Sequence, residues 1–222
     1  MNSVYGLFVV VICVTIIYII GSNLYDNLTW TRSSIDGEKY LVQNLPDKLK
    51  AANLLARVQK KLTNLVSRLN KSYPKNENIK RLVKKFNPNA IQEVSAHSQL
   101  TSYSVNKGEK IILCIRSRDG LNTLTDLNTI MFVALHELAH VMTISIGHTT
   151  EFWDFFRYIL SHAIHWKLYT PVNFKKKPVP YCGTNITDTP LSLKDMPKYI
   201  NLEKDEDDEP SNDATIVEIK KS

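Results

Sequence analysis

The segment at residues 127–148, LNTIMFVALHELAHVMTISIGH, decides the fold of this chain. Its first twenty residues are strongly apolar and long enough for a helix that crosses the core of a domain. His136 and His140 are four residues apart, so on a helix both imidazoles lie on one face and can reach the same metal ion. Glu137 lies about 100° around the helix from His136 and flanks that ion, where a carboxylate can take a proton from water. The pattern indicates a catalytic zinc site with Glu137 as its general base.

A catalytic zinc ion needs a third protein ligand and keeps a fourth position open. Gly147 breaks the helix and His148 follows it directly, so a chain that reverses at Gly147 would bring His148 back toward the ion. We therefore expect His148 to be the third ligand. The following helix, expected from about residue 149 to 165, offers other candidates, which are Glu151, His162 and His165.

The rest of the central region predicts an α+β domain at residues 46–200. Apolar residues spaced by three and four predict an amphipathic helix at 47–71, and a shorter helix is expected at 78–86. Two β-branched and aromatic runs at 101–105 and 110–115 flank Asn106-Lys107-Gly108-Glu109, which indicates a hairpin. The exposed faces of both helices are rich in Lys and Arg, which fits either an ordinary solvated face or a surface for nucleic acid or anionic lipid.

Residues 4–20, VYGLFVVVICVTIIYII, carry no charged side chain. As a helix they would be about 25 Å long, which is at the short edge of a bilayer span. A cleaved signal peptide is disfavoured because no basic residue precedes the run and no small-residue cleavage site follows it. We expect a single-pass membrane anchor at residues 1–25, a linker at 26–45, and a location in a membrane whose sidedness stays open.

The net charge of +6 results from two parts of the chain whose charges have opposite signs. Residues 201–222 hold eight acidic residues and three lysines, a net charge of −5, which leaves +11 on residues 1–200. Low hydrophobicity and like charges predict that the acidic segment is disordered. It would act as a solvated tail or, alternatively, as a mask for the basic surface.

The motif HELAH at 136–140, followed by GHTTEF at 147–152, resembles the WLM and SprT-like zinc metallopeptidases of the zincin group. The resemblance runs from about residue 86 to 183 and includes TSYSVNKGEKIILCIR at 101–116 and PVPYCG at 178–183. The chain is similar in particular to membrane-anchored WLM-like proteins of large DNA viruses. The abundance of Ile, Lys and Asn suits an AT-rich genome.

This resemblance implies a zincin-like fold with a small antiparallel or mixed sheet beside the active-site helix. It implies Zn²⁺ as cofactor, His136, His140 and His148 as its ligands, and Glu137 as general base. It also implies that an edge strand aligns the substrate, for which 110–115 is the candidate. The implied function is a membrane-anchored zinc metalloendopeptidase that acts on proteins or peptides at a host or virion membrane. The alternative is a catalytically silent zincin-fold protein with a structural or nucleic-acid-binding role.

Two further features were left open by the sequence. Tyr181 is a candidate oxyanion donor, although a tyrosine in this position more often serves packing. Cys114 and Cys182 could pair in an oxidising compartment, but we favour reduced cysteines in the core.

Overall fold

The computed structural model describes residues 2–25 and 27–191 of the chain. The acidic segment at 201–222 and the end of the predicted domain at residue 200 lie outside the described residues. The central fold class is confirmed, because helices and small sheets are mixed along the chain as an α+β domain requires.

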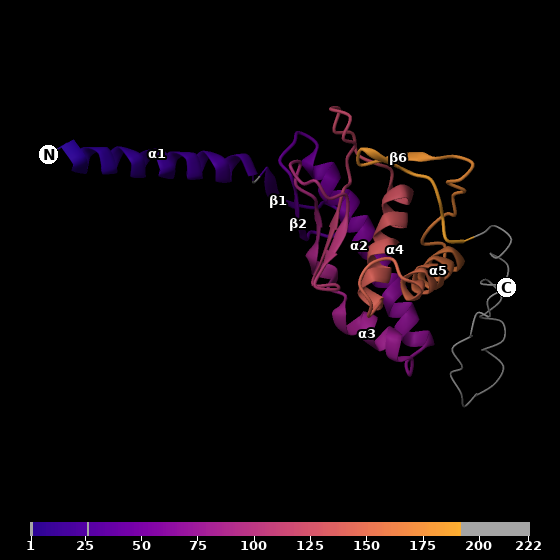
Figure 1. The fold of residues 1–222 in the computed structure, drawn as a ribbon. Helices are drawn as coiled ribbons and strands as arrows, with labels where there is room; N and C mark the ends of the chain where they lie inside the picture. Colours follow the sequence, from indigo (N-terminus) through magenta and orange to yellow (C-terminus); the bar gives the residue numbers. More distant parts are fainter. Residues whose placement is uncertain (1, 26, 192–222) are drawn as a thin grey trace, which may run out of the picture.

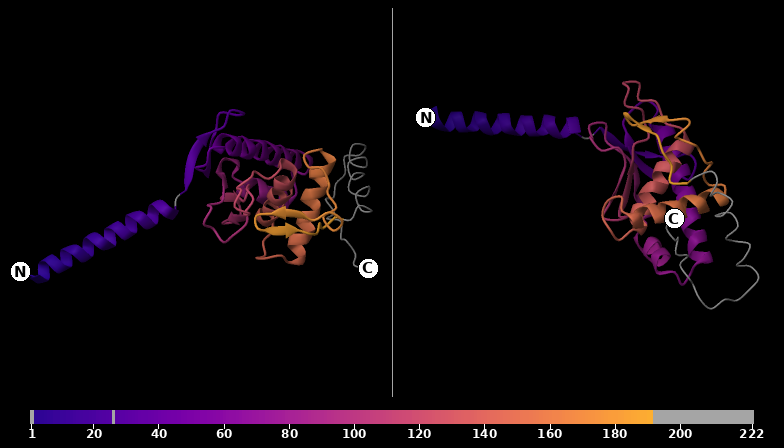
Figure 2. Two further views of the ribbon diagram at one scale, coloured as in Figure 1. Left: turned by 90° about the horizontal axis from the view of Figure 1, so that it is seen from above. Right: turned by 45° about the vertical axis from the view of Figure 1, so that its right-hand side comes forward.

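Helix α1, Asn2–Tyr25, extends away from the rest of the protein in all views (Figures 1 and 2). The side chains of residues 5–17 are exposed. Among the helices of the described residues, none combines the length and the apolar character that a membrane span requires. The predicted anchor and membrane location are therefore not supported.

A linker was predicted at residues 26–45, but its described part, residues 27–45, contains two paired strands that contact the domain. Strand β1, Leu28–Arg32, pairs antiparallel with β2, Lys39–Gln43, with Leu28 opposite Gln43 and Arg32 opposite Lys39. Both strands contact helix α2, and Val42 is fully buried. Because only a few apolar side chains of this hairpin face the core, its short strands resemble a linker in sequence.

The two basic helices form as predicted. Helix α2 spans Lys48–Ser72 and buries one apolar stripe, while α3 spans Glu77–Lys85 and begins at Asn76, whose side chain accepts hydrogen bonds from the next turn. The stripe of α2 packs against β2, β3 and α4, which places this helix beneath the sheet.

The main sheet has three strands in the order β3–β5–β4. A short 3₁₀ turn, Pro88–Ala90, leads into β3, Ile91–Glu93, which pairs parallel with β5, Lys110–Leu113. Strand β4, Tyr103–Val105, pairs antiparallel with β5, as the hairpin signal predicts. The sheet is therefore mixed.

The turn between β4 and β5 depends on Gly108. The two residues before it have φ values of 47° and 57°, and Gly108 itself has φ 114°. A Cβ atom at Gly108 would lie 2.5 Å from the backbone oxygen of Lys85 and 2.7 Å from a methyl group of Val141. A glycine is thus required for the turn to approach α3 and α4 this closely.

The order of the strands corrects the expected substrate strand. Residues 110–115 include β5, which lies in the centre of the sheet with both edges paired. Among the described strands, β4 pairs on one side only, with β5, and it contacts α4. Sequence alone does not separate these two strands, because both are short and β-branched.

Helix α4, Leu127–Met142, crosses the core between the sheet and helix α5, Thr150–His165 (Figure 1). Asp126 caps its start by accepting a 3.0 Å hydrogen bond from the Thr129 N–H. It ends four residues earlier than predicted, at Met142, because Thr143 already has extended backbone angles; the Thr143 hydroxyl donates a 2.7 Å hydrogen bond to the Ala139 carbonyl.

A second hairpin covers one end of α4. Strands β6, Val179–Tyr181, and β7, Thr184–Ile186, flank a two-residue turn in which Cys182 and Gly183 both have positive φ. Cys182 is disulfide-bonded to Cys114, which follows β5. The expectation of reduced cysteines was therefore wrong. The bond joins residues 68 positions apart, a proximity that spacing in the sequence does not reveal.

A buried ion-pair network joins the first half of the domain to the sheet. Arg116 donates from Nε to the Glu93 carboxylate and from Nη1 to the Asp47 carboxylate, at 2.8 Å in each case. Arg116 is 3% and Glu93 0% exposed, so the two charges neutralise each other away from water. The start of α2, strand β3 and the end of β5 are thereby held in one arrangement.

Candidate functional site

The three predicted histidine ligands meet at one point. His136 and His140 project from the same face of α4, and His148 comes from the loop after it, where Gly147 has φ 82°. The Nε2 atom of His148 lies 3.0 Å from Nε2 of His136 and 3.2 Å from Nε2 of His140. Their candidate ligand atoms all lie within 4.8 Å of one another.

This geometry fits a tetrahedral metal ion. Zinc–nitrogen bonds of about 2.0–2.1 Å place neighbouring nitrogens of a tetrahedral site about 3.3 Å apart. The two measured nitrogen separations are close to that value. Three imidazoles from one helix and one loop leave a side of the site free for water or substrate.

The histidines are electrically suited to ligation. Burial, with the neighbouring histidines His140 and His148, lowers the pKa of His136 to about 3. Burial, with His148 and Lys107 nearby, lowers the pKa of His140 to about 4. Both imidazoles are therefore neutral near pH 7 and keep a nitrogen lone pair for a cation.

An aromatic side chain that the sequence analysis left without a role supports the three rings. Phe152, in the first turn of α5, is fully buried and stacks on His140 at a centroid distance of 4.2 Å. It also meets His136 and His148 edge to face, at 4.8 and 4.7 Å. The buried ring of Phe152 thus packs against all three imidazoles and restricts their orientation.

Glu137 faces the opposite wall of the same site. It is 4% exposed, and burial raises its pKa to about 8 although the backbone N–H of Ser104 on β4 acts in the other direction. A divalent cation beside it would favour the ionised carboxylate and lower this pKa. The Glu137 carboxylate lines the same cleft as His136 and His140.

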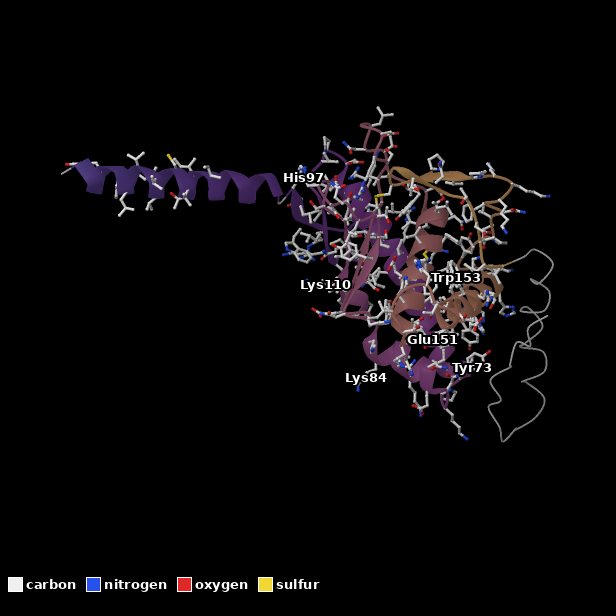
Figure 3. The ribbon with its side chains drawn as sticks, viewed as in Figure 1. Tyr73, Lys84, His97, Lys110, Glu151 and Trp153 are labelled. Carbon is white, nitrogen blue, oxygen red and sulfur yellow. A yellow bond between two sulfur atoms is a disulfide. The ribbon has the colours of Figure 1, made fainter. Side chains whose placement is uncertain are left out.

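Glu151, the alternative third ligand, has another role. Its carboxylate accepts hydrogen bonds from the backbone N–H groups of Ile144 and Ser145, both at 3.0 Å, and from the Ser145 hydroxyl at 2.6 Å. Burial alone would raise the pKa of Glu151, but the hydrogen bonds from Ser145 and Ile144 outweigh it and lower the pKa. In Figure 3, Glu151 and Trp153 extend from the start of α5, beside this loop.

The same loop is held from the other side by Lys107. Its ammonium group donates hydrogen bonds to the carbonyl oxygens of Thr143, at 3.0 Å, and Ser145, at 2.5 Å. The loop that carries His148 is therefore held between the β4–β5 turn and α5. The sequence did not predict these hydrogen bonds from Lys107, because in the sequence Lys107 is only one residue of a polar turn.

The other histidines lie elsewhere. His162 is buried on α5, where its Nε2 lies 3.1 Å from the Tyr73 hydroxyl and its Nδ1 lies 2.8 Å from the Tyr158 carbonyl. His165 lies in the last turn of α5, beside Trp166. His97, to which the sequence analysis gave no role, lies on the sheet side of the domain, away from Trp153 (Figure 3). None of these three joins the cluster.

A cleft of about 590 Å³ opens above the histidines. One wall is α4 with His136 and Glu137, and the facing wall is formed by β4 and the segment before it. Tyr181, from the β6–β7 hairpin, also lines the cleft.

Comparison with known proteins agrees with this arrangement. The family model of the WLM domain matches residues 36–205, which include all three histidines. This chain belongs to the WLM family. That membership supports a metallopeptidase function and, through the family, zinc as the metal.

Its relatives are proteins of large DNA viruses. The WLM chain is 32% identical to uncharacterized protein R325 of Acanthamoeba polyphaga mimivirus over 175 residues, which cover 77% of this chain and 88% of the relative. It is 30% identical to uncharacterized protein 136R of Invertebrate iridescent virus 6 over 145 residues, which cover 63% of this chain and 72% of that protein.

Among solved structures, Wss1 from Saccharomyces cerevisiae is similar with a TM-score of 0.42 and 23% identity, covering 57% of this chain and 88% of that one. A mutant of Wss1 from S. pombe is similar with a TM-score of 0.38 and 21% identity, covering 55% of this chain and 92% of that one.

Proposed function

We propose that this WLM protein is a zinc-dependent endopeptidase whose metal ligands are His136, His140 and His148. The convergence of three imidazole nitrogens beside the buried carboxylate of Glu137, on the wall of an open cleft, carries the proposal. A purely structural zinc site is closed by four protein ligands and has no need of a general base. The membrane location expected from the sequence is not part of this proposal.

Glu137 is the base in the proposed reaction. It takes a proton from the attacking water and passes it to the leaving amine, and the N–H of Ser104 keeps the carboxylate oriented. Zinc, when bound, supplies Lewis-acid chemistry that activates water and polarises the scissile carbonyl. Burial of Glu137 strengthens these electrostatic effects, because water does not screen them.

Strand β4 is the proposed guide for the substrate. It pairs only with β5 among the described strands, and its other side lines the cleft opposite α4. An extended peptide that adds to this edge would lie across the histidine cluster with its backbone hydrogen-bonded to β4. Backbone recognition of this kind predicts cleavage of unfolded or extended protein segments with weak side-chain preference.

A second candidate function rests on the charge of α2. This helix contains seven basic residues and no acidic residue. Lys61 is engaged with the Leu168 carbonyl, and Arg68 lies over the ring of Trp166 at 5.6 Å, but most of the other cations are exposed. An uncompensated basic face along one helix favours binding of a polyanion such as nucleic acid, either beside peptidase activity or in place of it.

The peptidase proposal is tested with the full chain in the zinc-loaded form. We expect casein cleavage that a chelator stops and added Zn²⁺ restores, followed by gel electrophoresis and mass spectrometry of the products. Stoichiometric zinc without cleavage, together with salt-sensitive DNA binding, would favour the second candidate. Casein cleavage together with DNA binding that depends steeply on salt would support both candidate functions.

A further inference from the structure

The wall of the cleft opposite the histidines carries two hydroxyl groups in direct contact. The Oγ atom of Ser102, just before β4, lies 2.6 Å from the hydroxyl oxygen of Tyr181 on β6. Both residues line the cleft together with Glu137. Burial, together with the nearby charge of Glu137, raises the pKa of Tyr181, so the hydroxyl keeps its proton.

The hydrogen bonds of this pair leave one proton unused. Each hydroxyl has one proton to donate, and the bond between them uses one of the two. Ser102 Oγ also accepts a 2.9 Å hydrogen bond from the backbone N–H of Cys114, and this N–H acts on the Tyr181 oxygen as well. Within the described part of the chain, neither hydroxyl has a further acceptor. Whichever of the two donates to the other, one O–H therefore remains for a group in the cleft.

The pair is also fixed in place. Tyr181 is followed by Cys182, whose disulfide partner is Cys114, the residue that donates to Ser102. The tight turn at Cys182-Gly183 sets Tyr181 opposite Thr184. The disulfide, the hydrogen bond from Cys114 to Ser102 and the β6–β7 pairing thus hold the two oxygens at the cleft wall. A donor to a transition state requires such preorganisation.

We infer that the Ser102–Tyr181 hydroxyl pair donates one hydrogen bond to the scissile carbonyl oxygen of the peptide substrate as that oxygen gains negative charge. The inference deepens the proposed peptidase function and rests on it. It assigns the pair a role in the transition state and not in zinc binding, since neither residue belongs to the histidine cluster.

The proton count predicts an unusual pattern of mutational effects. Tyr181→Phe frees the Ser102 proton, and Ser102→Ala frees the Tyr181 proton, so each single variant retains one donor. We expect each to lower kcat by about 10-fold or less. The double variant lacks both hydroxyls and should lower kcat by about 100-fold or more relative to the natural sequence, with KM and zinc content unchanged.

The measurement uses the full zinc-loaded chain and a fluorogenic peptide built around the fastest-cleaved casein bond. Tyr169→Phe is the matched control, because Tyr169 is 3% exposed against 5% for Tyr181 and does not belong to the residues that line the cleft. This control should match the natural sequence. A double variant that keeps its kcat, or that changes only KM, would overturn the inference.

A binding experiment separates this inference from the proposed function. A phosphinic peptide carries a tetrahedral anionic group in place of the scissile amide. If the natural sequence cleaves nothing, the proposed peptidase function fails, and titration calorimetry with the phosphinic peptide still tests the hydroxyl pair. Affinity about 10-fold or more weaker in the double variant supports the pair as an oxyanion donor. Equal affinity in both proteins rejects it.

Discussion

The Nε2 atoms of His136 and His148 lie 3.0 Å apart, although twelve residues and the end of a helix separate them in the chain. Their approach depends on a loop that is braced from two sides, by Glu151 and by Lys107. The candidate zinc site is thus formed by α4 and by a loop whose conformation is determined elsewhere in the domain.

Replacement of His148 should remove a ligand. The loss of a residue that only orients a metal ligand weakens metal binding by about 10- to 100-fold. We expect His148→Ala, which removes a ligand itself, to weaken zinc binding by more than that. Zinc affinity is measured by competition with a chromophoric chelator. His165→Ala, a histidine at the far end of α5, is the control and should leave the affinity unchanged. Equal zinc affinity in the two variants would argue against His148 as a ligand.

Replacement of Glu151 should loosen the loop without removing a ligand. Glu151→Gln loses the charge that accepts three hydrogen bonds from Ile144 and Ser145, so His148 is less well placed. We expect zinc affinity to fall by about 10-fold, with an unchanged helical circular dichroism spectrum. Glu77→Gln, at an exposed ion pair on α3, should have no effect. A Glu151→Gln protein with full zinc affinity would show that the brace is dispensable.

The disulfide should contribute to stability. The bond between Cys114 and Cys182 closes a loop of 68 positions, which corresponds to about 4 kcal/mol in the chain-entropy account. We expect Cys182→Ser to lower the free energy of unfolding in urea by about 2–4 kcal/mol under oxidising conditions. Cys13→Ser changes the free cysteine of α1 and should leave the unfolding curve where it is. The idea fails if non-reducing mass spectrometry finds no Cys114–Cys182 peptide.

The buried network predicts a pH dependence of stability. The hydrogen bond from Arg116 holds the pKa of Asp47 below its usual value of about 3.9. Its contribution to stability is therefore present above about pH 4 and lost as the pH falls through the lowered pKa. Asp47→Asn should destabilise the protein at pH 7, and the difference from the natural sequence should shrink in acid.

The control for this pH effect is Asp154→Asn, which removes a surface ion pair with Arg157. Unfolding free energies are measured by urea denaturation between about pH 3 and 7, the range that spans the ordinary carboxyl pKa. A difference between Asp47→Asn and the natural sequence that does not vary with pH would contradict this reading of the network.

Much of the fold could be predicted because helix periodicity is a local property. The ranges of α2, α3 and α5, and the β4–β5 hairpin, follow from residues close together in sequence. The clustering of the three histidines could likewise be predicted, since His136 and His140 share a helix face and Gly147 precedes His148.

The features that the sequence did not reveal depend on contacts between distant residues. Strand β5 is central because β3 joins it from twenty residues away, and β4 is an outer strand of the sheet among the described residues. The same holds for the pairing of Cys114 with Cys182 and for the packing of Phe152 against the three imidazoles. Such relations have no periodic signature in the chain.

The most direct test of the account compares peptide hydrolysis by the natural sequence and by Glu137→Gln when both contain one zinc ion per chain. The account predicts equal zinc content and a loss of kcat of about 100- to 10,000-fold in the variant, because the histidines remain and the base is gone. Glu109→Gln, on the β4–β5 turn, should keep full activity. Equal hydrolysis by Glu137→Gln and the natural sequence would contradict the central claim.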